Sequence, residues 1–318
     1  MEGKARPVFI IGTGRCGSTL IQELLAKHPD VAFISNVDTT FSGLNSKGRW
    51  NNPLYRRFPR QFANRDTPYL KHLRFTLRER LHYGPSEGYS LLSRQVSPLV
   101  SSPHRDLTAD DVTPWLERRL REFVADRVRA QRRPVFLHKF TGWPRAGFLK
   151  AIFPDARFVH VIRDGRAVAS SLVQRPWWKG YLGVPGWGFG ALPESYEREW
   201  RSSGYSYVVL AGLEWMVMMD AFEAAKARIP EEDWMDLRYE DFVDEPRRSA
   251  EALVRFSGLP SSREFDREVG RREFSRARLN AYDRDLTSHQ LAALQHVLSD
   301  HLRALGYDTK ATPASAPD

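Results

Sequence analysis

The residues whose types and spacing could do chemistry are concentrated between Gly12 and Thr19. Gly12 is followed by four residues and then by Gly17, Ser18 and Thr19. Glycines at such a turn allow consecutive backbone N–H groups to point at one anion, and the start of a helix adds partial positive charge. This stretch therefore predicts a binding site for a phosphate or sulfate group.

The loop departs from the Walker A pattern in the position of its cation. Walker A requires Gly-Lys before the Ser or Thr, whereas Ser18 stands where that lysine should be. The cation is instead Arg15, inside the loop. Such a loop can bind phosphate, but it lacks the lysine that contacts the β- and γ-phosphates of a nucleoside triphosphate. Cys16 could be a reactive thiol, although a small residue that offers its backbone N–H is the simpler interpretation.

A strand, a turn and a helix must position this loop. Residues 8–11 form a short apolar run with β-branched members, which predicts a buried parallel strand. Residues 18–28 have a helical period and end before Pro29. The glycine-rich turn thus joins the carboxyl end of a strand to the start of a helix.

A second unit of the same kind begins at residues 157–162. This predicted strand runs directly into Arg163, and a helix follows with Ser171 eight residues further on. An arginine and a hydroxyl in that arrangement can bind a second phosphate group.

The remaining pattern predicts an α/β fold, a three-layer sandwich around a central parallel sheet. Further strands are expected at residues 30–34, 134–138 and 234–238, with amphipathic helices between them. We expect residues 1–308 to form a single domain, with substrate-side insertions at 41–107 and 175–205. The second insertion is rich in Trp and Gly and lacks a helical period, which predicts an aromatic loop that could act as a lid. The small, polar segment 309–318 is expected to be disordered.

Two side chains at predicted strand ends could be a general base. Asp38 follows the second strand and would face the crevice beside the loop, or it would be a turn or N-cap aspartate. His138 ends the third predicted strand, where it could accept a proton or be a hydrogen-bonded structural histidine.

Composition narrows the class of ligand. The net charge of +9 suits an anionic partner, and because the arginines are spread along the chain we favour an anionic small molecule over nucleic acid. The longest apolar runs are too short to cross a membrane, so no stable membrane insertion is expected. Cys16 is the only cysteine, and no apolar signal segment opens the chain, which favours a cytoplasmic location.

These motifs together resemble the sulfotransferases that use 3′-phosphoadenosine 5′-phosphosulfate (PAPS). The resemblance rests on Arg15-Cys16-Gly17-Ser18-Thr19, on Arg163 with Ser171, and on the segment Tyr239-Glu240-Asp241 before a proline-started helix. It extends from residue 7 to about residue 307 and is strongest to the bacterial and Golgi-type branches. It implies the P-loop NTPase-like sulfotransferase fold.

The resemblance also implies a role for each matched residue. Arg15 would neutralise the leaving 5′-phosphate, Arg163 and Ser171 would select the 3′-phosphate, and Tyr239 would pack near the adenine. Arg276 or Arg278 would close over the donor. No metal is implied. The expected donor-binding residues are Gly14, Arg15, Cys16, Gly17, Ser18, Thr19, Arg163, Ser171, Tyr239, Arg276 and Arg278.

The general base is where the sequence departs from the family pattern. Related enzymes often carry a glutamate in the polar segment after the second strand, where this chain has Ser35 and Asn36 and then Asp38. Others use a histidine at the end of a middle strand, a role that His138 would suit. We rank Asp38 slightly above His138.

The expected reaction is transfer of a sulfuryl group from PAPS to a hydroxyl of a small-molecule or glycan acceptor, with an oligomeric state that the sequence leaves open. Two alternatives differ in class. A P-loop kinase or hydrolase would need the Walker lysine, against which Ser18 argues. A non-catalytic nucleotide-binding protein would keep Arg15 and Arg163 but would not need a base.

Overall fold

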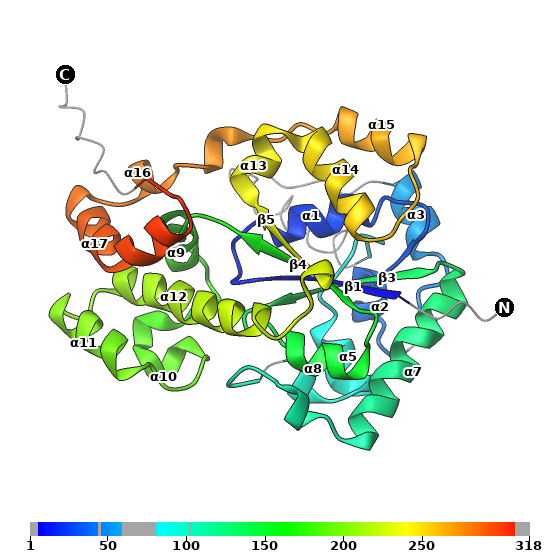
Figure 1. Ribbon diagram of the computed structural model, residues 1–318, viewed down its shortest axis with the longest axis horizontal. Coiled ribbons are helices and arrows are strands. Elements are labelled where there is room, and N and C mark those ends of the chain that lie inside the picture. The colour runs from blue at the N-terminus through cyan, green and yellow to red at the C-terminus, as the bar shows by residue number, and fades with distance from the viewer. Residues whose placement is uncertain (1–5, 44–45, 59–80, 102, 309–318) are drawn as a thin grey trace.

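A five-stranded parallel sheet forms the centre of the computed structural model, which describes residues 6–43, 46–58, 81–101 and 103–308 (Figure 1). The predicted disordered segment 309–318 lies outside these residues. The strands run in the order β2-β3-β1-β4-β5. Their bounds are β1 Arg6–Gly12, β2 Val31–Ala32, β3 Val135–Thr141, β4 Arg157–Ile162 and β5 Trp234–Arg238. The predicted α/β class with a central parallel sheet is confirmed.

Alternation along the strands supplies both faces of the sheet with apolar side chains. In β1, Val8 and Ile10 belong to one apolar cluster, whereas Phe9 and Ile11 belong to the other. The first face packs against helices α1, α3, α13, α14 and α15. The second packs against α5, α7, α8, α9, α12 and α17. The three layers that the sequence predicted are therefore present.

The helices that cover these faces begin and end as follows: α1 Ser18–Leu25, α2 Asn36–Thr40, α3 Asn51–Arg57, α5 Tyr89–Gln95, α6 Pro98–Ser101, α7 Pro114–Gln131, α8 Ala146–Ile152, α9 Gly165–Val173, α10 Val184–Trp187, α11 Glu194–Ser202, α12 Tyr207–Lys226, α13 Tyr239–Asp244, α14 Pro246–Phe256, α15 Arg263–Arg271, α16 Tyr282–Asp285 and α17 Ser288–Ala304. In the part of the chain that is described, no helix is both long and apolar enough to span a membrane.

Three segments differ from the sequence expectation. Strand β3 continues to Thr141, three residues beyond the predicted end, because Phe140 still packs in the apolar layer. The polar segment after β2 is the short helix α2, which a capping box at Ser35 begins. Residues 175–205, expected to lack regular structure, contain the short helices η2 (Gly180–Leu182), α10 and α11. Short helices of one turn or two leave little periodic signal in a sequence.

Candidate functional site

The turn between β1 and α1 has the backbone geometry of an anion cradle. Gly14, Arg15 and Gly17 all have positive φ angles, of 82°, 55° and 94°. These conformations turn successive N–H groups toward one side of the loop. Gly17 has a second constraint, because a Cβ there would lie 2.2 Å from the ring of Tyr239. The loop and β5–α13 are thus packed too closely for any larger residue.

Two arginines hold the loop against the second strand–turn–helix unit. The Arg15 Nε donates to Ser171 Oγ at 3.0 Å, so the two motifs that the sequence placed 156 residues apart meet. Arg163 donates to the backbone carbonyls of Arg15, at 3.0 Å, and Arg278, at 2.5 Å. Burial and the neighbouring cations Arg175 and Arg163 lower the pKa of Arg15. An anion bound here would relieve that mutual repulsion.

Of the other predicted donor-binding residues, Tyr239 lies beside Arg163, whereas Arg276 and Cys16 do not. The Tyr239 ring lies under Arg163, with 4.7 Å between the guanidinium carbon and the ring centroid. Arg276 lies apart from this group, since it is largely exposed and pairs with Asp244 at 2.7 Å. Cys16 is fully buried in the apolar cluster beneath the loop, a position that fits a small packing residue rather than an accessible thiol.

A cavity of about 1290 Å³ opens beside the loop. Gly14, Arg15, Gly17, Ser18, Thr19, Arg163, Tyr239 and Arg278 line it, and so do residues between Glu87 and Pro103, the β3–α8 turn, residues 177–189 and α12. These eight predicted donor-binding residues, from three distant motifs and the segment after α15, therefore share one cavity, whereas Cys16, Ser171 and Arg276 are not part of its lining. It is large enough for a nucleotide together with a second small molecule.

A lysine and a glutamate lie next to the cradle. Lys139 Nζ is 2.7 Å from Thr19 Oγ1 and 2.6 Å from Glu87 Oε1. Glu87 also accepts a hydrogen bond from Thr141 Oγ1 at 2.8 Å. Both Lys139 and Glu87 line the cavity. A carboxylate and an ammonium group thus meet where the cradle would hold an anion.

The pKa of Glu87 reflects two opposing effects. Burial raises it, but the charge of Lys139 and hydrogen bonds from Lys139, Thr141 and Tyr89 outweigh burial and hold the pKa below its ordinary value. The side chain is therefore ionised at neutral pH and can accept a proton.

Asp38 does not fill the role of base that the sequence suggested. It is residue N3 of the capping box of α2, where its carboxylate accepts from Ser35 N and Oγ, both at 2.9 Å. Ser46 and Asn51 donate to it as well. It is buried and does not line the cavity. Asp38 is therefore a helix-capping residue, the alternative that the sequence left open.

His138 is also outside the cavity. Because side chains alternate along β3, it points away from Lys139 and into the apolar layer. The centroids of its ring and of the Phe140 ring are 4.6 Å apart. Neither of its ring nitrogens has a hydrogen-bond partner among the described residues. Burial lowers its pKa to about 3. The imidazole is a neutral packing group here rather than a base that substrate could reach.

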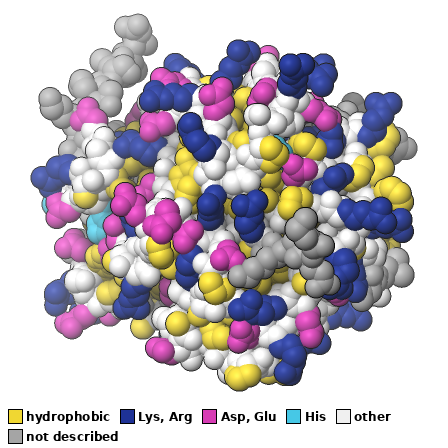
Figure 2. Space-filling model, turned by 45° about the vertical axis from the view of Figure 1, so that its right-hand side comes forward, with side chains coloured by type: hydrophobic (Ala, Val, Ile, Leu, Met, Phe, Trp, Pro, Cys, Tyr) yellow, Lys and Arg dark blue, Asp and Glu magenta, His cyan; other side chains and the backbone are white. Residues whose placement is uncertain are grey.

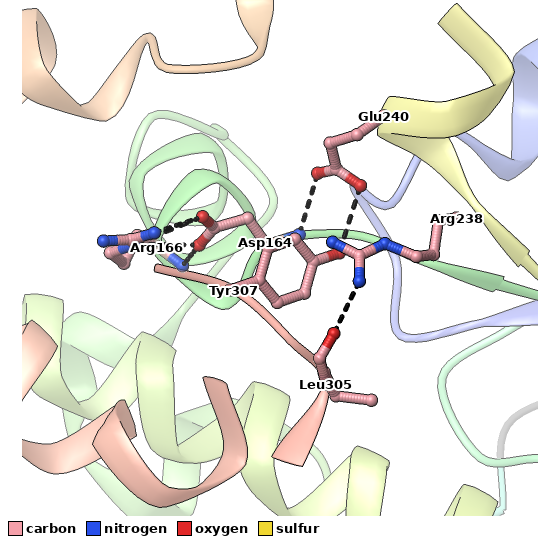
Figure 3. Close-up of polar contacts among 6 residues, drawn as sticks. All are labelled: Asp164, Arg166, Arg238, Glu240, Leu305 and Tyr307. Carbon is pink, nitrogen blue, oxygen red and sulfur yellow. Dashed lines mark hydrogen bonds and ion pairs between the residues drawn. The ribbon is translucent and has the colours of Figure 1, made fainter. Parts of the chain in front are cut away.

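A polar network supports the donor side of the cavity from behind (Figure 3). Glu240 accepts from the backbone N–H of Asp164 at 3.1 Å and from the Tyr307 hydroxyl at 3.0 Å. Arg238 donates to the carbonyl of Leu305 at 2.5 Å and lies over the Tyr307 ring. The glutamate of the Tyr239-Glu240-Asp241 motif thus fastens the turn after Arg163 to the end of α17.

Sequence reasoning gave neither Glu87 nor Lys139 a role. Glu87 lies in a segment without periodicity, and nothing local marks it as more than a turn residue. Lys139 follows His138 in the same strand, so the two side chains lie on opposite faces of the sheet. The strand pairing shows which face each one takes: His138 pairs with Phe9 of one apolar cluster, and Lys139 pairs with Ile10 of the other.

The fold and the cradle together define a class, an α/β protein with an anion cradle at the carboxyl ends of its strands. Comparison with known families goes further. Residues 7–263 match the model of the sulfotransferase family. The chain therefore belongs to the sulfotransferase family, and the expected family resemblance is confirmed.

Solved structures agree on the fold. The sulfotransferase STF9 from Mycobacterium avium is 17% identical, with a TM-score of 0.53 over 96% of this chain and 78% of that one. The sulfotransferase domain from the curacin biosynthetic pathway is 13% identical, with a TM-score of 0.50 over 96% and 98% of the two chains. At identities this low, the similarity shows a shared fold and no more. No curated protein matches the sequence significantly.

Proposed function

We propose that this enzyme transfers the sulfuryl group of PAPS to a hydroxyl of a small-molecule acceptor. The observation that carries the proposal is the contact of Lys139 with both Thr19 of the cradle and Glu87. It sets a cation and a base side by side at the place where a transferred group would pass from a phosphate to an acceptor oxygen. In-line transfer of such a group needs positioning and charge stabilisation above all.

The donor would be held by the cradle and the two arginines. Backbone N–H groups of the loop, with Ser18, Thr19 and Arg15, would bind the 5′-phosphate, and Arg163 with Ser171 would bind the 3′-phosphate. The fit rests on the positive φ angles of the loop, on the cavity volume and on the buried Nε of Arg163, which lacks a partner among the described residues. The ring of Tyr239 would pack against the nucleoside.

Glu87 would accept the proton of the acceptor hydroxyl in this proposal, in place of the residues that sequence reasoning favoured. While Lys139 pairs with it, Glu87 is a weak base because its pKa is held low. An anionic donor in the cradle would compete for the Lys139 ammonium. The pKa of Glu87 would then rise through burial toward neutrality, where general bases work best.

The alternatives are less well supported. A nucleotide kinase or hydrolase would still need the Walker lysine, and Ser18 lines the cavity at that position. Nucleic acid would favour a continuous basic patch, whereas Figure 2 shows Lys and Arg interspersed with Asp and Glu on the face that it draws. The proposal also allows an acceptor hydroxyl that belongs to a glycan. A cytoplasmic location, expected from the lone cysteine, stays a prediction.

The proposal is tested first by ligand binding. Adenosine 3′,5′-bisphosphate (PAP), at about 100 times its Kd, should add about 2.7 kcal/mol of stability, and ATP with Mg²⁺ should add much less. Turnover of labelled PAPS is then measured with a panel of phenols, alcohols and sugars. Stabilisation by ATP with Mg²⁺ but not by PAP would contradict the donor assignment. PAP binding without label transfer to any member of the panel would favour a non-catalytic nucleotide-binding protein.

A further inference from the structure

Far from the cradle along the sequence, α12 contributes a carboxyl group to the same cavity. Glu214 lies in the middle of this apolar helix, and only 3% of it is exposed. Leu172, Trp143, Trp177 and Phe189 line the same cavity, alongside the polar groups described above. A charged residue type in such surroundings is rare unless something pairs with it.

The carboxyl of Glu214 has one hydrogen bond within the described chain. Trp178 Nε1 donates to its Oε2 at 2.8 Å. This indole holds one oxygen in place, and the other oxygen has no partner among the residues that the structure describes. None of the ion pairs found between described residues involves Glu214. The arrangement fixes the orientation of the carboxyl but does not neutralise it.

The acids elsewhere in this cavity are different. Glu87 pairs with Lys139, and Glu23 pairs with Arg272 at 3.0 Å. Burial raises the pKa of Glu214 to about 8, against the smaller opposing effect of the Trp178 hydrogen bond. A protein cation would have lowered that pKa. Among the described residues, Glu214 therefore lacks the countercharge that Glu87 and Glu23 have, and a ligand could supply it.

We propose that the acceptor is an amine-bearing alcohol or phenol, whose ammonium group pairs with Glu214 while its hydroxyl lies at Glu87. This substrate class rests on the sulfuryl-transfer function proposed above. Two features of the site favour a cation over a neutral group. A buried carboxylate is stabilised by a charged partner, and aromatic faces such as those of Trp143, Trp177 and Phe189 attract ammonium groups.

The test uses matched pairs of molecules that differ in one amino group. Tyramine is compared with 4-ethylphenol, and 6-aminohexan-1-ol with hexan-1-ol, each titrated calorimetrically into the protein saturated with PAP. We expect at least one amine to bind ten-fold or more tightly than its uncharged partner. If neither amine is preferred, the proposal is overturned, and this comparison needs no variant.

A variant then assigns the preference to one side chain. Glu214→Gln keeps an oxygen for the Trp178 indole but cannot pair with a cation, so the preference for the amine should fall at least ten-fold while the Kd of PAP stays unchanged. Glu223→Gln, an exposed change on the same helix, should alter neither value. A preference that survives in Glu214→Gln would overturn the assignment.

The two proposals fail in different ways. If the amine binds through Glu214 but PAPS transfers no sulfuryl group to it or to the rest of the acceptor panel, the proposed reaction fails and the amine site stands. If amine-bearing alcohols are sulfated no better than their uncharged partners, by the wild type and by Glu214→Gln alike, the reaction stands and the amine site fails.

Discussion

The two ends of the central cavity are built on different physical principles. The donor end is formed by one backbone turn and by arginines, with Arg163 bonded to the carbonyls of Arg15 and Arg278. The acceptor end is formed by aromatic rings and by two carboxyl groups, Glu87 and Glu214. In the proposed function, the arginines at the first end would bind an anionic donor, and the carboxyl groups at the second end would face an acceptor that must lose a proton.

The two carboxyl groups at the acceptor end also differ from each other. Glu87 is ionised, because Lys139 and Thr141 stabilise its negative charge. Burial raises the pKa of Glu214 to about 8, so without a ligand the group is protonated near neutral pH, and a bound cation would favour its ionised form. When two titratable groups in one cavity have pKa values moved in opposite directions, their environments assign them different tasks. Glu87 is suited to accept a proton, and Glu214 is suited to bind a cationic group of a ligand.

The largest expected effect comes from removing the charge of Glu87. Glu87→Gln should lower kcat by about 10²- to 10⁴-fold, the usual contribution of a general base. The Kd of PAP should stay the same or fall slightly, since Lys139 loses its competing carboxylate. Steady-state kinetics with PAPS and a calorimetric titration with PAP would measure the two values.

The matched control is Asp38→Asn, which changes a carboxylate outside the cavity. It should leave kcat within about three-fold of wild type and lower the free energy of unfolding by about 1–2 kcal/mol, because the capping box of α2 is weakened. A loss of kcat in Asp38→Asn as large as that in Glu87→Gln would return the role of base to Asp38.

A smaller effect should follow from changes at the donor end. Arg163→Ala should weaken PAP binding by about 10- to 100-fold, as expected for lost hydrogen bonds to a charged group. It should affect AMP, which lacks the 3′-phosphate, much less. Isothermal titration with both nucleotides gives the comparison.

Arg276→Ala serves as the control for this change, because Arg276 is exposed and pairs with Asp244 away from the cavity lining. It should shift the Kd of PAP less than three-fold. Equal losses of PAP and AMP affinity in Arg163→Ala would mean that the arginine organises the loop rather than binding the 3′-phosphate.

The sequence predicted the first end better than the second, because the two ends are built differently. The donor end comes from two strand–turn–helix units in which the binding residues immediately follow a strand, so Gly17 and Arg163 were found from local patterns alone. The parallel sheet then brings the strand ends together. Because β1 and β4 are neighbours in the sheet, Arg15 of the first unit meets Ser171 of the second.

The acceptor end depends on long-range packing that no local pattern encodes. Glu87, Trp143 and Glu214 come from three segments that meet only in the folded chain. In α12, Glu214 reads as a polar residue in an apolar helix, and only the position of Trp178 shows that it is buried and oriented. His138 was a candidate base because it ends the predicted strand, but a shift of one residue along a strand reverses the face, and it is Lys139 that lines the cavity.

The last prediction concerns the apolar layer behind the acceptor end, where His138 is buried as a neutral ring. Its pKa is about 3 in the folded protein and about 6.5 in the unfolded chain. Below pH 6.5 the unfolded chain therefore takes up a proton that the folded protein excludes. Between pH 6.5 and about 3, this group lowers the free energy of unfolding by about 1.4 kcal/mol for each unit by which the pH falls.

His138→Leu should remove this dependence and leave kcat within a few-fold of wild type, because the ring touches neither cavity nor cradle. Urea unfolding of both proteins at pH 7, 6 and 5 would measure the difference. The stability advantage of the variant should grow as the pH falls, while other acid-sensitive groups contribute equally to both proteins. Parallel stability profiles together with a large loss of kcat would place His138 in the reaction after all, and the acceptor end would then extend through both faces of β3.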